Sequence, residues 1–523
     1  MSLNLKTICL FLVVVLTFSL IGCNKGNSST ISSSSDTGVS SEDISSDLSS
    51  SESDLDFEYE MGAGKVDPSV DDNNQDNLGY EDYFGAKDPF GSNESTNNNQ
   101  TKDPNRDNVV VVNKTWSGPN GYVIVVPANN ASAKTSAESL QKFFKQANGV
   151  TLQIVTDETT PSNKEILVGK TNRSESDKSL ADSKLKVSVV GEKLVFDGGH
   201  DVTVDMAVQN FMLRSSGSRE VSTFEETTNF SSTKNSVYKY VWGDEFYGTS
   251  LNKSLWSDKS TKMTGAGVIE VESTPQTISV NNGALKLTAY KDEKGNYHVP
   301  TSVHTQSTMN FRYGYVEMRA KLSLELGSFA SFWTRSISDN PKAAVAPSMQ
   351  LDHFFEVDMF EVFQRAGNQR IGGNILINSS TPSKNWYPTA MPSTQQLIIP
   401  DEEYHLFGYE WTPTEIKLYF DNKMYARFDM SKPWTGKTTA GKGIDGWNKT
   451  LREDKTGTNL ISFQEHQYLI FNHHLHIAVD DGNGGVKGFL ASDSVTKNTN
   501  FKNADYVIDY VRVYQQNKDI YTK

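Results

Sequence analysis

Cysteine is almost absent from this sequence of 523 residues, which contains 2. A small scaffold held together by disulfides needs several paired cysteines, and a cysteine-rich zinc site needs closely spaced clusters of them. The scarcity of cysteine therefore excludes both classes.

Basic charge and apolar content are also low. The chain has 50 Lys and Arg against 64 Asp and Glu, a formal net charge of -14, and 36% hydrophobic residues. Proteins that bind nucleic acid normally present a basic field, so the acidic balance argues against a nucleic-acid partner. Residues 24–107 carry 19 acidic and 5 basic side chains, so the negative charge belongs to that segment and says little about a substrate.

The only long apolar run, 7–22, follows Lys6 at the start of the chain. It is shorter than the roughly 20 residues that span a bilayer, and a basic start before an apolar stretch is typical of a secretory signal. The run ends in Leu20-Ile21-Gly22-Cys23, which resembles the bacterial lipobox. The resemblance implies a signal peptide over 1–23, a lipid on Cys23, and an extracytoplasmic protein anchored to the bacterial cell surface. An uncleaved anchor or an ordinary cleaved signal are the alternatives.

Residues 24–107 are rich in Ser, Asp and Asn and poor in apolar side chains. Such a composition cannot bury enough surface to offset chain entropy, so we expect a disordered acidic tether. A folded region attached to it would be held away from the membrane surface.

Residues 108–235 alternate between short apolar runs and helical periodicity. Strands are predicted at 109–112, 122–126, 152–155, 165–168, 185–190 and 193–196, and helices at 136–146 and 203–213. This alternation predicts a small α/β domain. Segments 166–173 and 194–199 resemble the non-catalytic domain that precedes several glycosidase catalytic domains.

Residues 236–523 change to short alternating strands separated by Gly, Asn, Pro and Asp. Few segments have helical length and periodicity. The pattern predicts an all-β sandwich as the main fold of the chain.

The most informative strand of that region carries Glu356, Asp358 and Glu361. Alternation places the first two on one face and would turn Glu361 into the apolar core, where an unpaired carboxylate is costly. One extra residue at Met359-Phe360, a β-bulge, would return Glu361 to the face of the other two. The sequence therefore predicts three carboxyl groups in a row on one sheet surface.

Three crowded carboxylates raise the pKa of at least one of them, which leaves one group protonated near neutral pH. One ionised and one protonated carboxyl are what a glycosidase needs, and a spacing near 5 Å is typical of retention through a covalent intermediate. A solvated acidic strand or a set of calcium ligands is the structural alternative.

The Glu-x-Asp-x-x-Glu motif resembles the bulged signature of glycoside hydrolase family 16. Supporting segments follow in the family's order: 241–246 with Leu255-Trp256, 311–321, Phe332-Trp333, 409–413, 419–421 and 508–514. The resemblance covers about 236–516. It implies a β-jelly-roll sandwich with an open cleft, in which Glu356 is the nucleophile, Glu361 the acid/base and Asp358 the residue that tunes them. No cofactor is implied for catalysis, but a structural calcium is, with Asp509 as a candidate ligand.

A polysaccharide cleft needs aromatic platforms and hydrogen-bonding side chains. The candidate substrate-binding residues are Trp333, Trp386, Trp434, Trp447, Asn472 and His474. Alternation places His474 and His476 on one face of their strand and His473 on the other. A metal site at these histidines lacks an evident third ligand, so hydrogen bonding to sugar is the preferred interpretation.

The predicted function is a retaining, endo-acting hydrolase that cleaves internal β-linkages of a polysaccharide by double displacement. Segment 327–333 lacks the first Trp and the Pro of the laminarinase pattern, and 373–378 lacks its His. These departures leave both the β-glucan and the β-galactan class open. A non-catalytic glycan-binding lipoprotein and a transglycosylase using the same carboxylates are the alternatives.

Overall fold

The computed structural model describes residues 109–215, 219–259, 269–281, 283–336, 353–365, 368–379, 397–429, 466–476, 479–480, 486–487 and 495–522. Cys23, the predicted tether, Trp386, Trp434 and Trp447 lie outside these residues, so the predictions made for them stay predictions. Within the described ranges, no helix is long and apolar enough to cross a membrane.

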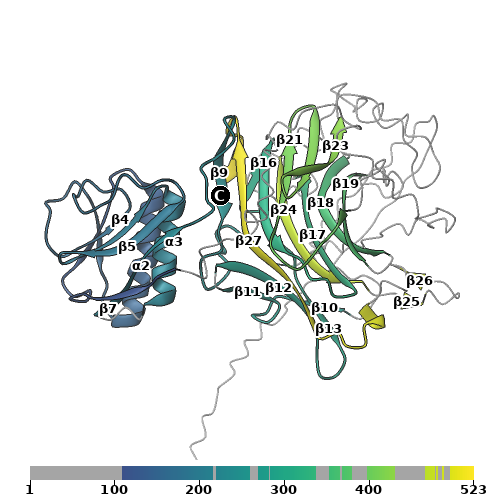
Figure 1. Cartoon of the computed structure of the whole chain (residues 1–523), viewed down its shortest axis with the longest axis horizontal. Coiled ribbons are helices and arrows are strands. Elements are labelled where there is room, and N and C mark those ends of the chain that lie inside the picture. Colours follow the sequence, from purple (N-terminus) through teal and green to yellow (C-terminus); the bar gives the residue numbers. More distant parts are fainter. Residues whose placement is uncertain are drawn as a thin grey trace, which may run out of the picture. The chain divides into compact units, whose positions relative to one another are not determined.

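The first part of the chain forms a seven-stranded mixed sheet with two helices. In sheet order its strands are β1 (Val112–Thr115), β7 (Glu220–Thr227), β5 (Lys184–Val190), β6 (Lys193–Gly198), β4 (Glu165–Val168), β2 (Val123–Val126) and β3 (Gln153–Thr156). The helices are α2 (Ala131–Asn148) and α3 (Asp201–Arg214). The predicted strand 109–112 begins only at Val112. Strand β7, which is labelled in Figure 1, was not predicted.

Local sequence accounts for the bounds of α2. The Asn130 side chain accepts a hydrogen bond from the backbone N–H of Ala133, which satisfies a donor at the start of the helix. At its end Gly149 takes the left-handed conformation, φ 72°, and its N–H donates to the Lys145 carbonyl. The buried face of the helix holds Leu140 and Phe144, as the predicted periodicity requires.

The rest of the described chain is a β-sandwich, as predicted. The larger sheet has eleven strands, with the central order β10-β13-β12-β27-β16-β21-β22-β23 and β8, β9 and β11 attached beside it. Their bounds are β8 (Thr233–Lys234), β9 (Tyr238–Asp244), β10 (Ile269–Glu272), β11 (Ile278–Asn281), β12 (Ala284–Lys291), β13 (Tyr297–Pro300), β16 (Gly314–Lys321), β21 (His405–Trp411), β22 (Glu415–Phe420), β23 (Lys423–Asp429) and β27 (Asn503–Gln515).

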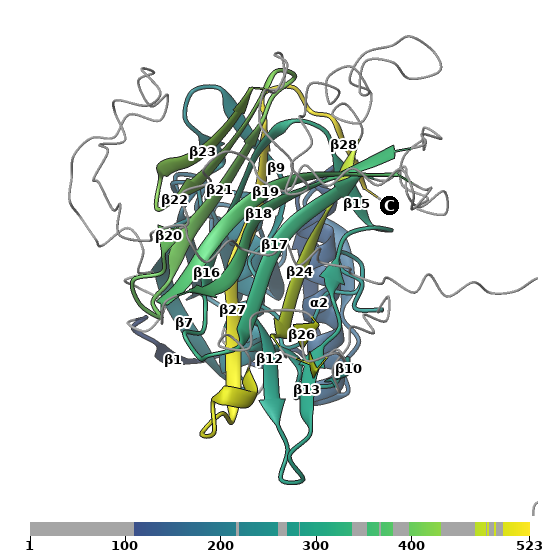
Figure 2. The ribbon, with the colours of Figure 1, turned by 90° about the vertical axis from the view of Figure 1, so that its right-hand side faces the viewer.

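The second sheet has eight strands in the order β20-β19-β18-β17-β24-β15-β28, with β14 paired to β24 (Figure 2). Its strands are β14 (Val303–His304), β15 (Met309–Phe311), β17 (Ser328–Ser336), β18 (His353–Arg365), β19 (Asn368–Ser379), β20 (Leu397–Ile398), β24 (Gln467–Leu475) and β28 (Ile520–Thr522). The strands β25 (Val479–Asp480) and β26 (Val486–Lys487) form a separate pair, and Val495–Lys497 forms a 3-10 turn.

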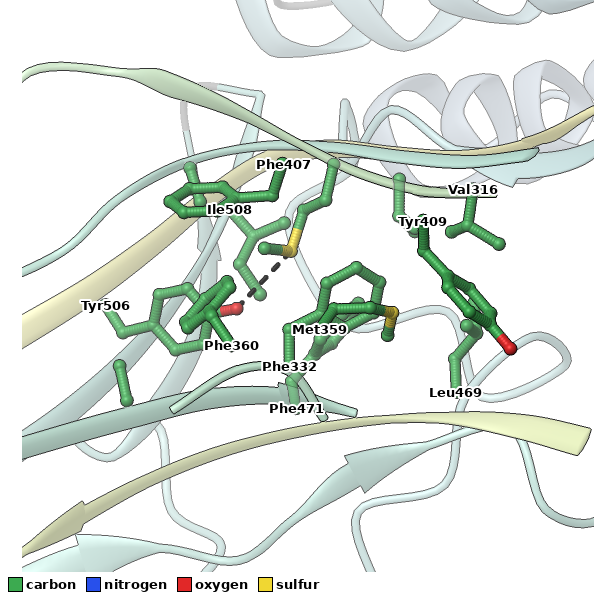
Figure 3. Close-up of a cluster of buried hydrophobic side chains, with 14 of the residues drawn as sticks. Val316, Phe332, Met359, Phe360, Phe407, Tyr409, Leu469, Phe471, Tyr506 and Ile508 are labelled. Atoms are coloured by element: carbon green, nitrogen blue, oxygen red, sulfur yellow. Dashed lines mark hydrogen bonds between the residues drawn. The ribbon is translucent and has the colours of Figure 1, made fainter. Parts of the chain in front are cut away.

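One apolar core joins the inner faces of the two large sheets (Figure 3). The eight-stranded sheet contributes Phe332, Phe360 and Phe471, and the eleven-stranded sheet contributes Phe407 and Tyr506; all five are buried. Burial of each such side chain stabilises the fold by roughly 1.5–3 kcal/mol. This core fixes which side of β17, β18 and β24 faces outward, and that outer face carries the candidate site.

Candidate active site

Strand β18 contains the bulge that the carboxylate spacing predicts. Against β17, Glu361 pairs with Ser331 and Phe360 with Phe332, but Trp333 already pairs with Asp358. Met359 is therefore the extra residue. The register against β19 shifts at the same place, between Asp358 and Glu361.

The bulge divides the side chains of β18 between two faces. Val357, Met359, Phe360 and Val362 all belong to the apolar core. Two consecutive core residues, at 359 and 360, are possible because the bulge interrupts strict alternation. Residues directly opposite each other in a ladder share a face, so Glu356, Asp358 and Glu361 lie on the outer face together with Arg335, Trp333 and Ser331.

The three carboxyl groups are withdrawn from solvent although they lie on the outer face. Glu356, Asp358 and Glu361 are 4%, 2% and 5% exposed. Buried carboxylates need a compensating charge or hydrogen bonds. Arg335 is in register with Glu356 and is itself buried, so a guanidinium lies on the same face as the acidic row.

Trp333 is held in place by a polar network on β24. Its indole Nε1 donates to Oδ1 of Asn472 at 2.6 Å, and its ring packs against Tyr468 and Ile470. The amide nitrogen of Asn472 donates to the Ser302 hydroxyl and lies 3.1 Å from Nε2 of His474. Trp333 is half-buried, as a stacking platform requires, whereas Asn472 is 2% exposed.

This network changes the role expected of Asn472. Its carbonyl and its amide group are both engaged inside the protein, so it orients Trp333 and has little surface left for a sugar. Ser302, between β13 and β14, was not singled out from the sequence. A lone serine between two short strands gives no signal of a partner 170 residues away.

The histidines of β24 divide as their alternation predicts. His473 enters the space between the sheets, where its Nδ1 donates to the Leu287 carbonyl at 2.8 Å and its Nε2 accepts from the Ser328 hydroxyl at 3.0 Å. His474 lies on the outer face, where burial lowers its pKa to about 4. A neutral ring is consistent with Nε2 of His474 accepting from Asn472.

The sequence raised a metal ion at two places, the histidines around β24 and Asp509. Among the described residues, no group of three or more His, Cys, Asp or Glu side chains is arranged to hold a metal ion. The buried Asp509 instead accepts from Nη1 of Arg319 at 2.6 Å, and the Arg319 guanidinium lies over the Tyr404 ring. A calcium ion at Asp509 would have to displace that guanidinium, so these residues do not fit the predicted ion.

A family model matches the part of the chain that holds the candidate site. Residues 267–444, which include the three carboxylates, match the model for Glycosyl hydrolases family 16. The chain is 24% identical over 299 residues to glucan endo-1,3-beta-glucosidase A1 of Niallia circulans, which covers 53% of this chain and 38% of that relative. It is 26% identical over 202 residues to keratan-sulfate endo-1,4-beta-galactosidase of Sphingobacterium multivorum. That match covers 36% of this chain and 44% of the relative.

Among solved structures, the chain resembles laminarinase from Flavobacterium sp. UMI-01 at 22% identity and a TM-score of 0.35, over 53% of this chain and 100% of that chain. The chain spans less than half the length of the two curated relatives named above. The family model and these relatives support the resemblance to glycoside hydrolase family 16 that the motifs indicated.

Proposed function

We propose that the chain is a retaining, endo-acting glycoside hydrolase that cleaves internal β-linkages of a polysaccharide. The observation that carries this proposal is the bulge at Met359, which places three buried carboxyl groups in one row on the outer face of a sheet. A strand that served only as a structural element would have no need to bury three acidic side chains beside one another.

In the first step the ionised Glu356 attacks the anomeric carbon, and Glu361 donates its proton to the leaving glycosidic oxygen. The bond between the anomeric carbon and that oxygen breaks, and a covalent glycosyl-Glu356 ester forms. Glu361, now ionised, takes a proton from water, and the resulting hydroxide attacks the same carbon and releases Glu356. Two inversions at one carbon retain its configuration.

Neighbouring side chains support both carboxyl roles. Asp358 lies between the two glutamates on the same face, where its charge would favour the protonated form that Glu361 needs as the acid. Arg335, in register with Glu356, favours the ionised form of the nucleophile. Trp333 would stack against a sugar ring, held at a fixed angle by Asn472.

The substrate belongs to the β-glucan or the β-galactan class, and one curated relative is named for each class. We also propose that the lipid on Cys23 and the acidic tether hold the enzyme at the bacterial cell surface, where polymeric substrate is accessible. The polysaccharide is then the main partner, and the membrane is contacted through the anchor alone.

The test is release of reducing ends from laminarin, lichenan, agarose, porphyran, carrageenan and mucin glycans, with the Glu356→Gln variant as control. Hydrolysis of one polymer by the native chain and its loss in the variant would support the proposal. Tight binding with no hydrolysis of any polymer would instead favour a glycan-binding lipoprotein. Longer products formed when acceptor sugars are added would favour a transglycosylase.

A further inference from the structure

A hollow lies on the outer side of the eleven-stranded sheet, whereas the carboxylate row lies on the eight-stranded sheet. Its volume is about 440 Å³, and its floor is formed by β12 and β27. Leu285 and Leu287 of β12 are buried in the core, so by alternation Lys286, Thr288 and Tyr290 face outward. The register places Asp505 opposite Thr288 and Asn503 opposite Tyr290, on the same outer face.

The charge of the hollow is mainly positive. Three lysines line it, Lys286, Lys291 and Lys502, against one carboxylate, Asp505. Asp505 is already engaged, because it accepts from the Thr288 hydroxyl at 2.7 Å and lies 3.4 Å from Nζ of Lys286. Lys291, whose Nζ also lies 5.2 Å from the centroid of the Tyr297 ring, and Lys502 supply the positive charge that can attract an anion.

Tyr290 provides a rigid aromatic wall. Its ring stacks on His298 at 4.6 Å with an angle of 8° between the planes, and its hydroxyl donates to Glu272 at 3.2 Å. His298 is itself held between Glu272 and Asp292, at 3.1 Å from each. Both carboxylates are thus engaged with His298, and neither is among the described residues that line the hollow.

A fixed aromatic ring beside amide, hydroxyl and ammonium groups is suited to a sugar that carries a negative substituent. The ring can stack against the apolar face of the sugar, Asn503 and Gln276 can hydrogen-bond its hydroxyl groups, and the lysines can pair with the anion. The hollow is open and polar, which fits a unit of a polymer better than an enclosed apolar ligand.

We propose that this hollow is a second, non-catalytic glycan-binding site that takes a sugar unit bearing a sulfate ester or a carboxylate. It goes beyond the proposed hydrolase activity and does not depend on it, because no side chain of the hollow belongs to the carboxylate face. If both sites engage one polymer, binding at the hollow raises the effective concentration of the polymer at the cleft.

The test measures binding of the full chain, in the Glu356→Gln background, to a sulfated galactan, a polyuronate and neutral laminarin by affinity electrophoresis. We expect Tyr290→Ala and the double variant Lys291→Gln/Lys502→Gln each to weaken binding to one of the anionic polymers by about tenfold. Binding to laminarin should not change. The polymer that responds identifies sulfate or carboxylate as the anion.

The matched control is Lys142→Gln/Lys145→Gln, which makes the same charge change on the exposed face of α2. Tyr290→Phe keeps the ring and should retain binding, which separates loss of the platform from loss of folding. The proposal would be wrong if the control variant Lys142→Gln/Lys145→Gln weakened binding as much as Lys291→Gln/Lys502→Gln does. It would also be wrong if Trp333→Ala were the only substitution that reduced binding. Unchanged binding of Tyr290→Ala to every polymer would overturn it as well.

Discussion

The indole nitrogen of Trp333 donates to the side-chain oxygen of Asn472 at 2.6 Å, and this bond links the candidate aromatic platform on β17 to the adjacent strand β24. The two residues are diagonal neighbours, because Ser331 is the residue directly opposite Asn472. The bond joins positions that are 139 residues apart in the sequence.

Asn472→Ala should impair substrate binding more than chemistry. Loss of the amide leaves the Trp333 indole N–H without its acceptor and frees the ring to rotate, at a cost of about 1–3 kcal/mol. We expect KM to rise by about tenfold while kcat falls much less. Steady-state kinetics on the responding polysaccharide measure this. Asn472→Asp, which keeps an acceptor oxygen, should lie between the native chain and the alanine variant. A fall in kcat with KM unchanged would contradict this role.

Glu361→Gln and Glu356→Gln should both abolish turnover without unfolding the chain. Each substitution keeps the shape of the side chain but removes the proton transfer or the nucleophile, so kcat should fall by about 10²–10⁴ or more. The configuration of the first product, followed by NMR, should show retention by the native enzyme. An inverted product would exclude the covalent intermediate. A variant with native turnover would exclude its residue from catalysis.

Acidification should destabilise the sandwich through His473. Burial lowers the pKa of His473 to about 4, against 6.5 for an unburied histidine. Because the unfolded chain binds a proton at higher pH than the folded chain, stability conferred by the neutral ring is present above pH 6.5. The free energy of unfolding should therefore fall by on the order of 3 kcal/mol as pH falls from 6.5 toward 4.

The measurement is the free energy of unfolding of native chain and His473→Gln between pH 7 and 4. The variant should be less stable at pH 7, since Ser328 and Leu287 lose a partner, but its stability should fall less steeply with acid. Parallel curves for the two proteins would show that His473 does not titrate in this range. Burial also raises the pKa of Asp244 to about 6, so protonation of Asp244 should increase the free energy of unfolding as pH falls. Comparison with the His473→Gln variant separates the contribution of His473 from this opposite effect.

Asp509→Asn should destabilise the fold whether or not calcium is present. The substitution removes the negative charge that faces the buried Arg319 guanidinium, and loss of such a buried ion pair costs about 3–5 kcal/mol. Thermal unfolding in EDTA and in added calcium measures it, with the exposed Asp401→Asn as the matched control. If calcium raises the melting temperature of the native chain and Asp509→Asn removes that increase, the aspartate is a calcium ligand and the ion-pair account is wrong.

Several features followed from the sequence alone because they depend on neighbouring residues. The period of two along β18, and the cost of burying Glu361 in a core, required the bulge before any partner strand was known. The same alternation divided His473 from His474. The helix α2 followed from its apolar periodicity and from the glycine at 149. Strand β7 was missed because its polar residues give little apolar signal, and its place between β1 and β5 comes from pairing with distant strands.

Other features required the tertiary structure because they join residues that are far apart in the chain. Asn472 looked like a sugar ligand until the adjacent strand showed that both ends of its amide are engaged. Asp509 looked like a calcium ligand until Arg319, 190 residues earlier, was found against it. The hollow over β12 and β27 has no local signature, since these two paired strands lie more than 200 residues apart in the sequence. Local alternation decides which face a side chain takes, whereas only the packing of strands decides what it meets there.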